Sequence, residues 1–260
     1  MSEDSRILAS LAQGDLEPWL LSIVKFVLAH THAGTTRYLP EIKLRLGIDS
    51  VALWDKIERE LNIAGAGPPY WAFAWAGGQA LARHLLDNPE VVAGRRVLDL
   101  ASGSGLVGIA AMKAGAAQAI ANDIDCLSAV VISLNAEANN VVVDVNATDL
   151  LGDDSGFDPT SIDVVLVGDG FYDHDLSPRI FKFVRRCRAA GCLVLVGDPG
   201  RADLPTQQLT KVHDYFVPVT RDCQHTAAST GGDEGEDIRR ATVWMLDPLP
   251  APSLPVVKSD

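Results

Sequence analysis

The chain has 260 residues, of which 47% are hydrophobic and 22% are charged. This composition is typical of a globular protein and argues against wholesale disorder. The 34 Asp and Glu residues outnumber the 22 Lys and Arg residues, which gives a net charge of −12. Since sequence-independent binding to nucleic acid depends on Lys and Arg that neutralise phosphates, no nucleic-acid partner is expected. The acidic balance suits a basic protein partner.

No targeting or membrane segment is expected. The acidic residues 1–6 resemble neither a secretory signal nor a transit peptide. The apolar stretch 16–29 is too short to span a bilayer and contains Glu17, Pro18 and Lys25, so it predicts an amphipathic helix. The four cysteines form no C-x-x-C pair, which favours reduced thiols in the cytoplasm. The six histidines show no metal-ligand spacing, so no metal site is predicted.

The N-terminal part of the chain predicts helices that pack on a larger domain. One or two helices are expected within residues 6–30, and a further helical pattern surrounds Leu53 and Ile57. A turn-rich break follows at residues 65–69. The expected divisions are an N-terminal helical extension over residues 1–67, a core domain over residues 68–250 and a tail over residues 251–260.

From residue 77 onward, strand patterns alternate with helix patterns. A helix is expected over residues 77–86 and ends at Asp87-Asn88-Pro89, because proline blocks its continuation. Strands are then expected at 95–100, 118–123, 141–146, 162–167 and 192–197, with helices at 105–114, 127–139 and 176–188. This alternation predicts an α/β fold in which a parallel sheet is covered on both faces.

The last two strands break this pattern. Residues 213–220 and 241–246 predict strands joined by the acidic, glycine-rich loop 230–237, which is expected to be mobile. Two consecutive strands without a helix between them predict an antiparallel hairpin. The complete prediction is a doubly wound, seven-stranded, mostly parallel sheet with a C-terminal antiparallel hairpin.

A glycine loop follows the first strand of the core domain and opens a helix. Gly103, Gly105 and Gly108 satisfy the G-x-G-x-x-G pattern of dinucleotide-binding proteins, but Asp99 and Ser102 precede the first glycine. A carboxylate there repels a pyrophosphate and suits a cationic amino-acid ligand, which the glycines allow to approach the backbone. The loop resembles the first motif of the seven-stranded methyltransferases that use S-adenosylmethionine. A tight turn without a ligand is the alternative.

Two acidic residues follow the next strands. Asp123 ends the second strand, and a carboxylate at that position can accept hydrogen bonds from both ribose hydroxyls. Asp149 follows the third strand, and the methyltransferase resemblance implies that it accepts from the adenine amino group. An exposed loop carboxylate is the alternative for each. The resemblance thus implies S-adenosylmethionine as cofactor, with Asp99, Ser102 and the glycines at its amino-acid end.

Longer stretches resemble the lysine methyltransferases of the electron transfer flavoprotein beta subunit, in particular their bacterial form. The most specific are Pro-Pro-Tyr-Trp-Ala at 68–72, Gly-Gly-Gln-Ala-Leu at 77–81 and Gly-Asp-Pro-Gly-Arg at 197–201. The resemblance covers roughly residues 36–246, and it departs at Ala101, where a glycine is more usual. It implies a Rossmann-like protein-lysine N-methyltransferase that is a cytoplasmic monomer, with the flavoprotein beta subunit as its protein substrate.

The motif Asp169-Gly170-Phe171-Tyr172 follows the fourth strand and resembles the D-x-x-Y motif of these enzymes. Glutamine methyltransferases place Asn-Pro-Pro-Tyr there, whereas a carboxylate matches an amine donor. The resemblance implies that Asp169 orients the acceptor amine and that Tyr172 shapes the pocket or forms a hydrogen bond near the reacting groups. An ordinary loop after the strand is the alternative for both. The Asp169 charge alone would keep the amine protonated, while the sulfonium and desolvation act in the opposite direction.

Other side chains have weaker assignments. Trp75 is expected to pack on the adenine or the methionine chain of the cofactor, or else in the core. Tyr70 and Trp71 are expected to line a lysine channel or else to pack in the core. Arg201 is expected to contact the substrate protein or to brace the site. His174 is a candidate proton shuttle. The rival functions are methylation of ribosomal protein L11, which would need a separate N-terminal domain, and cofactor binding without catalysis.

Overall fold

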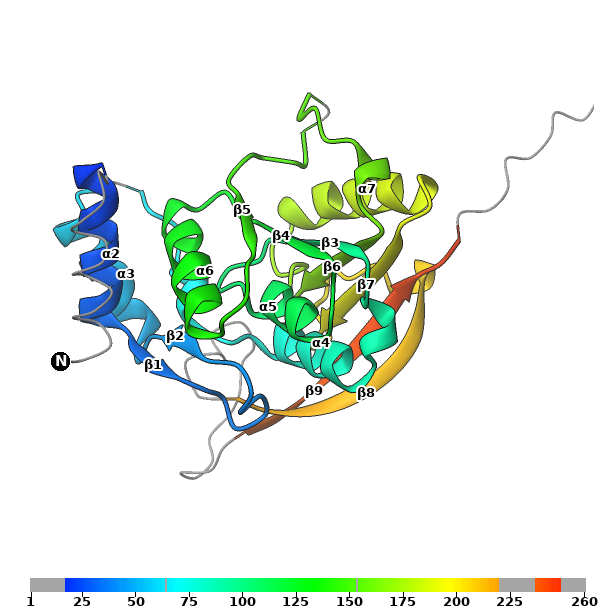
Figure 1. The fold of residues 1–260 in the computed structure, drawn as a ribbon, viewed down its shortest axis with the longest axis horizontal. Coiled ribbons are helices and arrows are strands. Elements are labelled where there is room, and N and C mark those ends of the chain that lie inside the picture. The colour runs from blue at the N-terminus through cyan, green and yellow to red at the C-terminus, as the bar shows by residue number, and fades with distance from the viewer. Residues whose placement is uncertain (1–16, 64, 153, 220–236, 249–260) are drawn as a thin grey trace, which may run out of the picture.

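A computed structural model describes residues 17–63, 65–152, 154–219 and 237–248 (Figure 1). The N-terminal part contains α2 (Pro18–His30), β1 (His32–Gly34), β2 (Leu44–Leu46), α3 (Ser50–Glu60) and η1 (Tyr70–Ala72). The core contains α4 (Ala76–Asp87), η2 (Pro89–Val91), β3 (Arg96–Leu100), α5 (Leu106–Lys113), β4 (Gln118–Asn122), α6 (Cys126–Ala138), β5 (Asp144–Asn146), η3 (Pro159–Ser161), β6 (Val164–Gly168), α7 (Leu176–Ala189), β7 (Leu193–Asp198), η4 (Thr206–Gln208), β8 (Leu209–Val219) and β9 (Asp237–Leu246). No helix in the described ranges is long and apolar enough to cross a membrane.

The main sheet has seven strands in the order β5-β4-β3-β6-β7-β9-β8. Strands β3 to β7 all run parallel to one another, and β9 is antiparallel to both β7 and β8. The predicted fold class is therefore confirmed as an α/β methyltransferase-type sheet with an antiparallel C-terminal hairpin. The strand order reverses at β3, which lies between β4 and β6, and ligands bind outside the carboxyl ends of strands at such a switch point.

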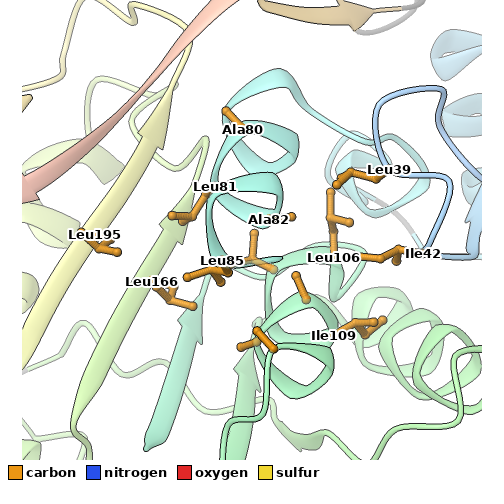
Figure 2. Packing of buried hydrophobic residues seen from close by; sticks show 14 of the residues in the cluster. Leu39, Ile42, Ala80, Leu81, Ala82, Leu85, Leu106, Ile109, Leu166 and Leu195 are labelled. Atoms are coloured by element: carbon orange, nitrogen blue, oxygen red, sulfur yellow. The ribbon is translucent and has the colours of Figure 1, made fainter. Parts of the chain in front are cut away.

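Helices cover both faces of this sheet. Successive residues of its buried strands point to opposite faces, and both sets are apolar, so each face needs a cover. Val164 and Leu166 of β6 pack in the cluster formed with α4 and α5, whereas Val165 and Val167 pack in the cluster under α7. Figure 2 shows the first cluster, where side chains of α4 lie beside Leu166 and those of β7. Runs of buried Val and Leu thus produce the two apolar layers that fix the sheet between the helices.

The N-terminal segment packs on the core through α6 (Figure 1). Residues of α2, α3 and η1 share one buried hydrophobic cluster with α6. Two amides of α6 also hold the backbone of the segment: Asn135 Oδ1 accepts from Arg45 N at 2.7 Å, and Asn139 Oδ1 accepts from Lys43 N at 3.0 Å. The segment also contains the small antiparallel sheet β1-β2, which the helical pattern did not indicate. The domain boundaries at residues 67 and 250 stay a prediction.

Several strand boundaries differ from the expectation. Only Asp144–Asn146 of the expected strand 141–146 pairs with the sheet, and Val142 is exposed. Strands β8 and β9 are longer than expected, because their pairing runs from Leu209 opposite Leu246 to Val219 opposite Asp237. Asp237, expected in the acidic loop, therefore belongs to a strand. The rest of that loop, Cys223 and residues 1–16 lie outside the described residues.

Candidate active site

A cavity of about 530 Å³ opens at the carboxyl ends of β3, β4 and β6. Its size lies within the roughly 300–1,000 Å³ of pockets that enclose small molecules. Eight of the nine predicted site residues line it: Trp75, Asp99, Ser102, Gly103, Asp123, Asp149, Asp169 and Tyr172. The fold thus brings both the glycine loop and the Asp-x-x-Tyr motif to one cavity at the switch point.

The ninth predicted residue, Gly105, lies behind this wall. Its φ is 80°, and a Cβ there would come within 3.2 Å of Ile132 in α6. Glycine is required at this position because the backbone is left-handed and α6 packs against it, so Gly105 shapes the turn without lining the cavity. Ala101 also has a left-handed φ, 53°, which costs a residue with a Cβ about 1–2 kcal/mol. This conformation explains why glycine suits that position better.

Asp99 is a buried carboxylate at the amino-acid end of the predicted cofactor site. Its Oδ2 accepts hydrogen bonds from the Ser102 hydroxyl and from Gly108 N, the latter at 2.8 Å. Burial outweighs these hydrogen bonds and raises the pKa of Asp99 to about 7. A carboxylate destabilised by burial gains most from a ligand cation, so this residue fits an ammonium group. Ser102 contributes by orienting Asp99.

Asp123 connects the end of β4 to the glycine loop. Its Oδ2 accepts from Gly103 N at 2.8 Å, and its Oδ1 accepts from Asp125 N at 3.0 Å. Burial raises the pKa of this carboxyl above its ordinary value. Since each carboxylate oxygen has two lone pairs, Asp123 can hold the loop and still accept from a ligand in the cavity.

Asp149 lies at a more exposed part of the wall. Arg179 in α7 donates to its Oδ2 at 2.6 Å, and about half of each side chain is exposed. This guanidinium lowers the pKa of Asp149 below its usual value. The ion pair leaves Asp149 on the cavity wall beside a basic residue that the sequence analysis did not single out.

Aromatic side chains form another part of the wall, and we call Tyr70, Phe73, Trp75 and Tyr172 the aromatic cluster. The rings of Tyr70 and Tyr172 are 4.9 Å apart, and the Trp75 ring lies 5.7 Å from that of Tyr70. Trp75 Nε1 donates to the Tyr70 carbonyl at 2.9 Å, which fixes the indole. Burial raises the pKa of Tyr172 well above its usual range, so its phenol stays protonated. Trp71 is buried and packs in the core.

Asp169 already has protein partners on both carboxylate oxygens. Its Oδ2 accepts from Gly77 N in the first turn of α4 at 3.0 Å, and its Oδ1 accepts from Arg201 Nε at 2.8 Å. Its backbone has a φ of 67°, rare for a residue other than glycine, and its N donates to the Gly197 carbonyl at 2.8 Å. Such a strained, fully buried conformation is typical of a functional position.

The structure also assigns residues that the sequence analysis left uncertain or missed. Arg201 lines the cavity and braces Asp169, in agreement with one of its two expected roles. Gly77, expected as the first residue of a helix and as part of the Gly-Gly-Gln-Ala-Leu stretch, also binds Asp169 through its backbone N–H. His174 does not line the cavity, and its exposed ring pairs with Asp203 at 3.2 Å. Within the described ranges, no cluster of His, Cys, Asp and Glu is suited to a metal ion.

Comparison with known proteins identifies the family. A family model described as lysine methyltransferase matches residues 60–213. The chain is also 38% identical to the electron transfer flavoprotein beta subunit lysine methyltransferase of Xenopus laevis over 225 residues, which are 86% of each chain. The chain belongs to this lysine methyltransferase family. The enzymes of the same name from Danio rerio (39% identity, 73% of this chain and 72% of the relative) and Homo sapiens (35%, 80% and 76%) also match it.

This membership confirms the expectation of an S-adenosylmethionine-dependent protein-lysine methyltransferase. These relatives are animal proteins, so they do not support the finer expectation of a bacterial form. The cavity of this lysine methyltransferase fits the cofactor, because it combines a carboxylate with a pKa near 7, a left-handed glycine loop and an aromatic wall. The carboxylate suits the ammonium of the cofactor, and the glycine loop allows its amino-acid chain to approach the backbone. The aromatic wall suits its adenine base.

Proposed function

We propose that this enzyme transfers methyl groups from S-adenosylmethionine to lysine residues of the electron transfer flavoprotein beta subunit, as a cytoplasmic monomer. The proposal is carried by one observation: a single cavity joins the glycine loop with Asp99 to the Asp-x-x-Tyr motif with Asp169. The names of the relatives support the choice of substrate. Methylation of ribosomal protein L11 is the nearest rival.

The glycine-loop side of the cavity would hold the cofactor. Asp99, oriented by Ser102, would accept from its ammonium, and Asp123 would accept from its ribose hydroxyls. Trp75 would pack on its adenine or methionine chain, and Asp149 would accept from the adenine amino group. The bound cofactor supplies an electrophilic methyl group on a sulfonium.

The Asp-x-x-Tyr side would receive the acceptor lysine. Transfer would require the lone pair of the lysine Nζ, because the cofactor would supply its methyl group as an electrophile. Lysine must enter as the neutral amine, although its ordinary pKa is near 10.4. Asp169 would accept from the amine through its remaining lone pairs, and Tyr70 and Tyr172 of the aromatic cluster would enclose the alkyl chain and exclude water.

The surface near this end of the cavity carries exposed acidic residues. Asp173 and Asp175 follow β6, and Asp203 follows β7. Together with the net charge of −12, they favour encounter with a basic segment that carries the acceptor lysine. Such exposed charges are screened by salt, so the rate of encounter should fall as ionic strength rises.

The test is to incubate the purified enzyme and radiolabelled S-adenosylmethionine with purified electron transfer flavoprotein, with ribosomal protein L11 and with a cell extract. We expect label on lysines of the flavoprotein beta subunit, located by mass spectrometry, and a slower reaction at higher salt. Label on L11 without label on the flavoprotein would reverse the ranking of the two substrates.

A second experiment tests the acceptor end. Misplacing a nucleophile by about 1 Å can cost about 100-fold in rate, so Asp169→Asn should slow single-turnover transfer at least that much with saturating cofactor. Tyr172→Phe keeps the ring contact with Tyr70 and should be milder. If Asp169→Asn stays within about threefold of wild type, under about 1 kcal/mol on the barrier, the lysine is held elsewhere.

A further inference from the structure

Asp169 faces the acceptor end of the cavity as one half of an ion pair. Arg201 Nε lies 2.8 Å from Asp169 Oδ1, and the two side chains are only 14% and 2% exposed. Both residues line the cavity. An incoming lysine therefore meets two charges that largely cancel, whereas a lone carboxylate would present a full negative charge in a poorly solvated place.

The position of Arg201 is set by its own loop. Asp198, at the end of β7, is buried, and its Oδ1 accepts from Gly200 N and Arg201 N at 2.7 Å each. Gly200 adopts a left-handed φ of 95° within this turn. The turn places the guanidinium against Asp169, so the protein's own backbone holds the ion pair in place.

We propose that Arg201 is a positioning residue that lets Asp169 orient the acceptor amine without holding it in its protonated form. The inference rests on the proposed place of the acceptor lysine at this end of the cavity. A nearby opposite charge changes a pKa by about 1–3, so a lone Asp169 would favour the unreactive ammonium. Beside Arg201, Asp169 still has free lone pairs for an amine N–H, while the guanidinium disfavours a second positive charge.

Other ionisable groups interact with this pair or with the tyrosines beside it. They are Asp198 behind the pair, Tyr70 and Tyr172 in the aromatic cluster, and Asp123 and Asp173. Burial raises the pKa of Asp198 to about 6, and it raises the pKa of both tyrosines above the usual 10.0. All of these groups are present in each variant below, so a difference between variants reports the charges of the Asp169–Arg201 pair.

The test compares the pH dependence of single-turnover methyl transfer, from pH 6.5 to 9.5 with saturating cofactor, among variants that change these charges. Arg201→Gln leaves Asp169 unopposed and raises the pKa of the bound amine by about 1–3, so the rate at pH 7 should fall more than about tenfold below wild type. The gap should narrow toward pH 9.5, because Arg201, the sulfonium and desolvation together hold the pKa of the amine in wild type well below 10.4. The double variant Asp169→Asn/Arg201→Gln removes both charges and should be slower by a constant factor at every pH. Arg185→Gln, on an exposed position of α7 outside the cavity, is the control and should follow wild type.

A binding measurement adds a readout that does not depend on turnover. Without cofactor and below pH 8, Arg201→Gln should bind the lysine-bearing substrate protein several-fold more tightly than wild type, because the lone carboxylate retains the ammonium. Calorimetry with the flavoprotein, or with whichever protein the wild-type enzyme labels in an extract, measures this. Failure of wild type to label the flavoprotein would refute the proposed substrate but leave this comparison possible.

The inference would be overturned if the ratio of the Arg201→Gln rate to the wild-type rate stayed constant across pH and the substrate affinity were unchanged. Arg201 would then have a purely structural role. Removing one partner of a buried ion pair can unfold a protein, whereas removing both is better tolerated. If Arg201→Gln does not fold, Asp169→Asn is compared with the double variant. As pH falls below 8, the rate of Asp169→Asn should then fall less than the rate of the double variant. An equal pH dependence of these two variants would overturn the inference.

Discussion

Gly77 and Gly197 place the first turn of α4 and the end of β7 in direct backbone contact. A Cβ on Gly197 would lie 2.1 Å from the Gly77 carbonyl oxygen, and one on Gly77 would lie 2.3 Å from that of Gly197. The same two residues hold Asp169, whose N donates to the Gly197 carbonyl and whose Oδ2 accepts from Gly77 N. The contact between two glycines therefore positions Asp169 and the side of the cavity that carries the Asp-x-x-Tyr motif.

This contact predicts that Gly197→Ala strongly destabilises the protein. The added methyl group would meet backbone, which cannot move aside as a flexible side chain can, so the cost should reach or exceed the upper end of the usual 1–3 kcal/mol for overpacking. Urea unfolding followed by circular dichroism measures it. Gly152→Ala is the matched control, because nothing lies within 4 Å of a Cβ there. Equal midpoints for the two variants would contradict the close approach.

The pKa of Asp99 predicts that cofactor binding depends on pH. The pKa of this carboxyl is about 7 in the folded protein and 3.8 in the unfolded chain. Its contribution to the free energy of unfolding therefore falls as pH rises between these two values. A ligand ammonium pairs with the ionised form, so affinity for S-adenosylhomocysteine should rise with pH, on the order of tenfold from pH 5.5 to 7.5. Calorimetry should also detect proton release. Asp99→Asn should bind more weakly and lose this dependence, and an unchanged slope would place the ammonium elsewhere.

Asp123 holds the glycine loop and is proposed to bind the cofactor ribose, and two substitutions separate these roles. Asp123→Ala should weaken cofactor binding by about 1–3 kcal/mol, because charge-assisted hydrogen bonds to the ribose are lost. Asp123→Asn keeps one acceptor for Gly103 N and should retain the loop while still losing affinity. Calorimetry gives the affinities, and thermal unfolding shows whether the loop contact matters for stability. Wild-type affinity in a folded Asp123→Ala protein would remove Asp123 from the site.

The left-handed backbone at Ala101 predicts a stabilising substitution. Relief of the Cβ strain, about 1–2 kcal/mol, should exceed the entropy cost of a glycine, about 0.5–1 kcal/mol. Ala101→Gly should therefore raise the free energy of unfolding by up to about 1.5 kcal/mol, whereas the β-branched Ala101→Val should lower it. Thermal unfolding of both proteins tests the sign. A lower melting temperature for Ala101→Gly would show that the loop tolerates the side chain without strain.

Much of the fold could be predicted because its signals are local. Runs of Val and Leu between turn residues marked β3, β6 and β7, and the alternation with helices implied their parallel order. The signal was weaker where a strand is short and exposed, as in β5, or where polar residues occupy an edge hairpin, as in β9. The sheet β1-β2 escaped prediction because three-residue strands leave no periodic pattern.

The sequence by itself determined which acidic and glycine residues meet at the site. Asp99 lies near the carboxyl end of β3, and Asp123 and Asp169 directly follow β4 and β6. The carboxyl ends of these parallel strands converge at one edge of the sheet. Only the tertiary structure decided what each carboxylate does there. Asp169 and Arg201 are 32 positions apart, and Asp169 and Gly77 are 92 apart. The contact with Gly77 depends on the packing of α4 against β6 and β7, and the contact with Arg201 depends on the pairing of β6 with β7. No local pattern records either arrangement, and the second one makes Asp169 half of an ion pair.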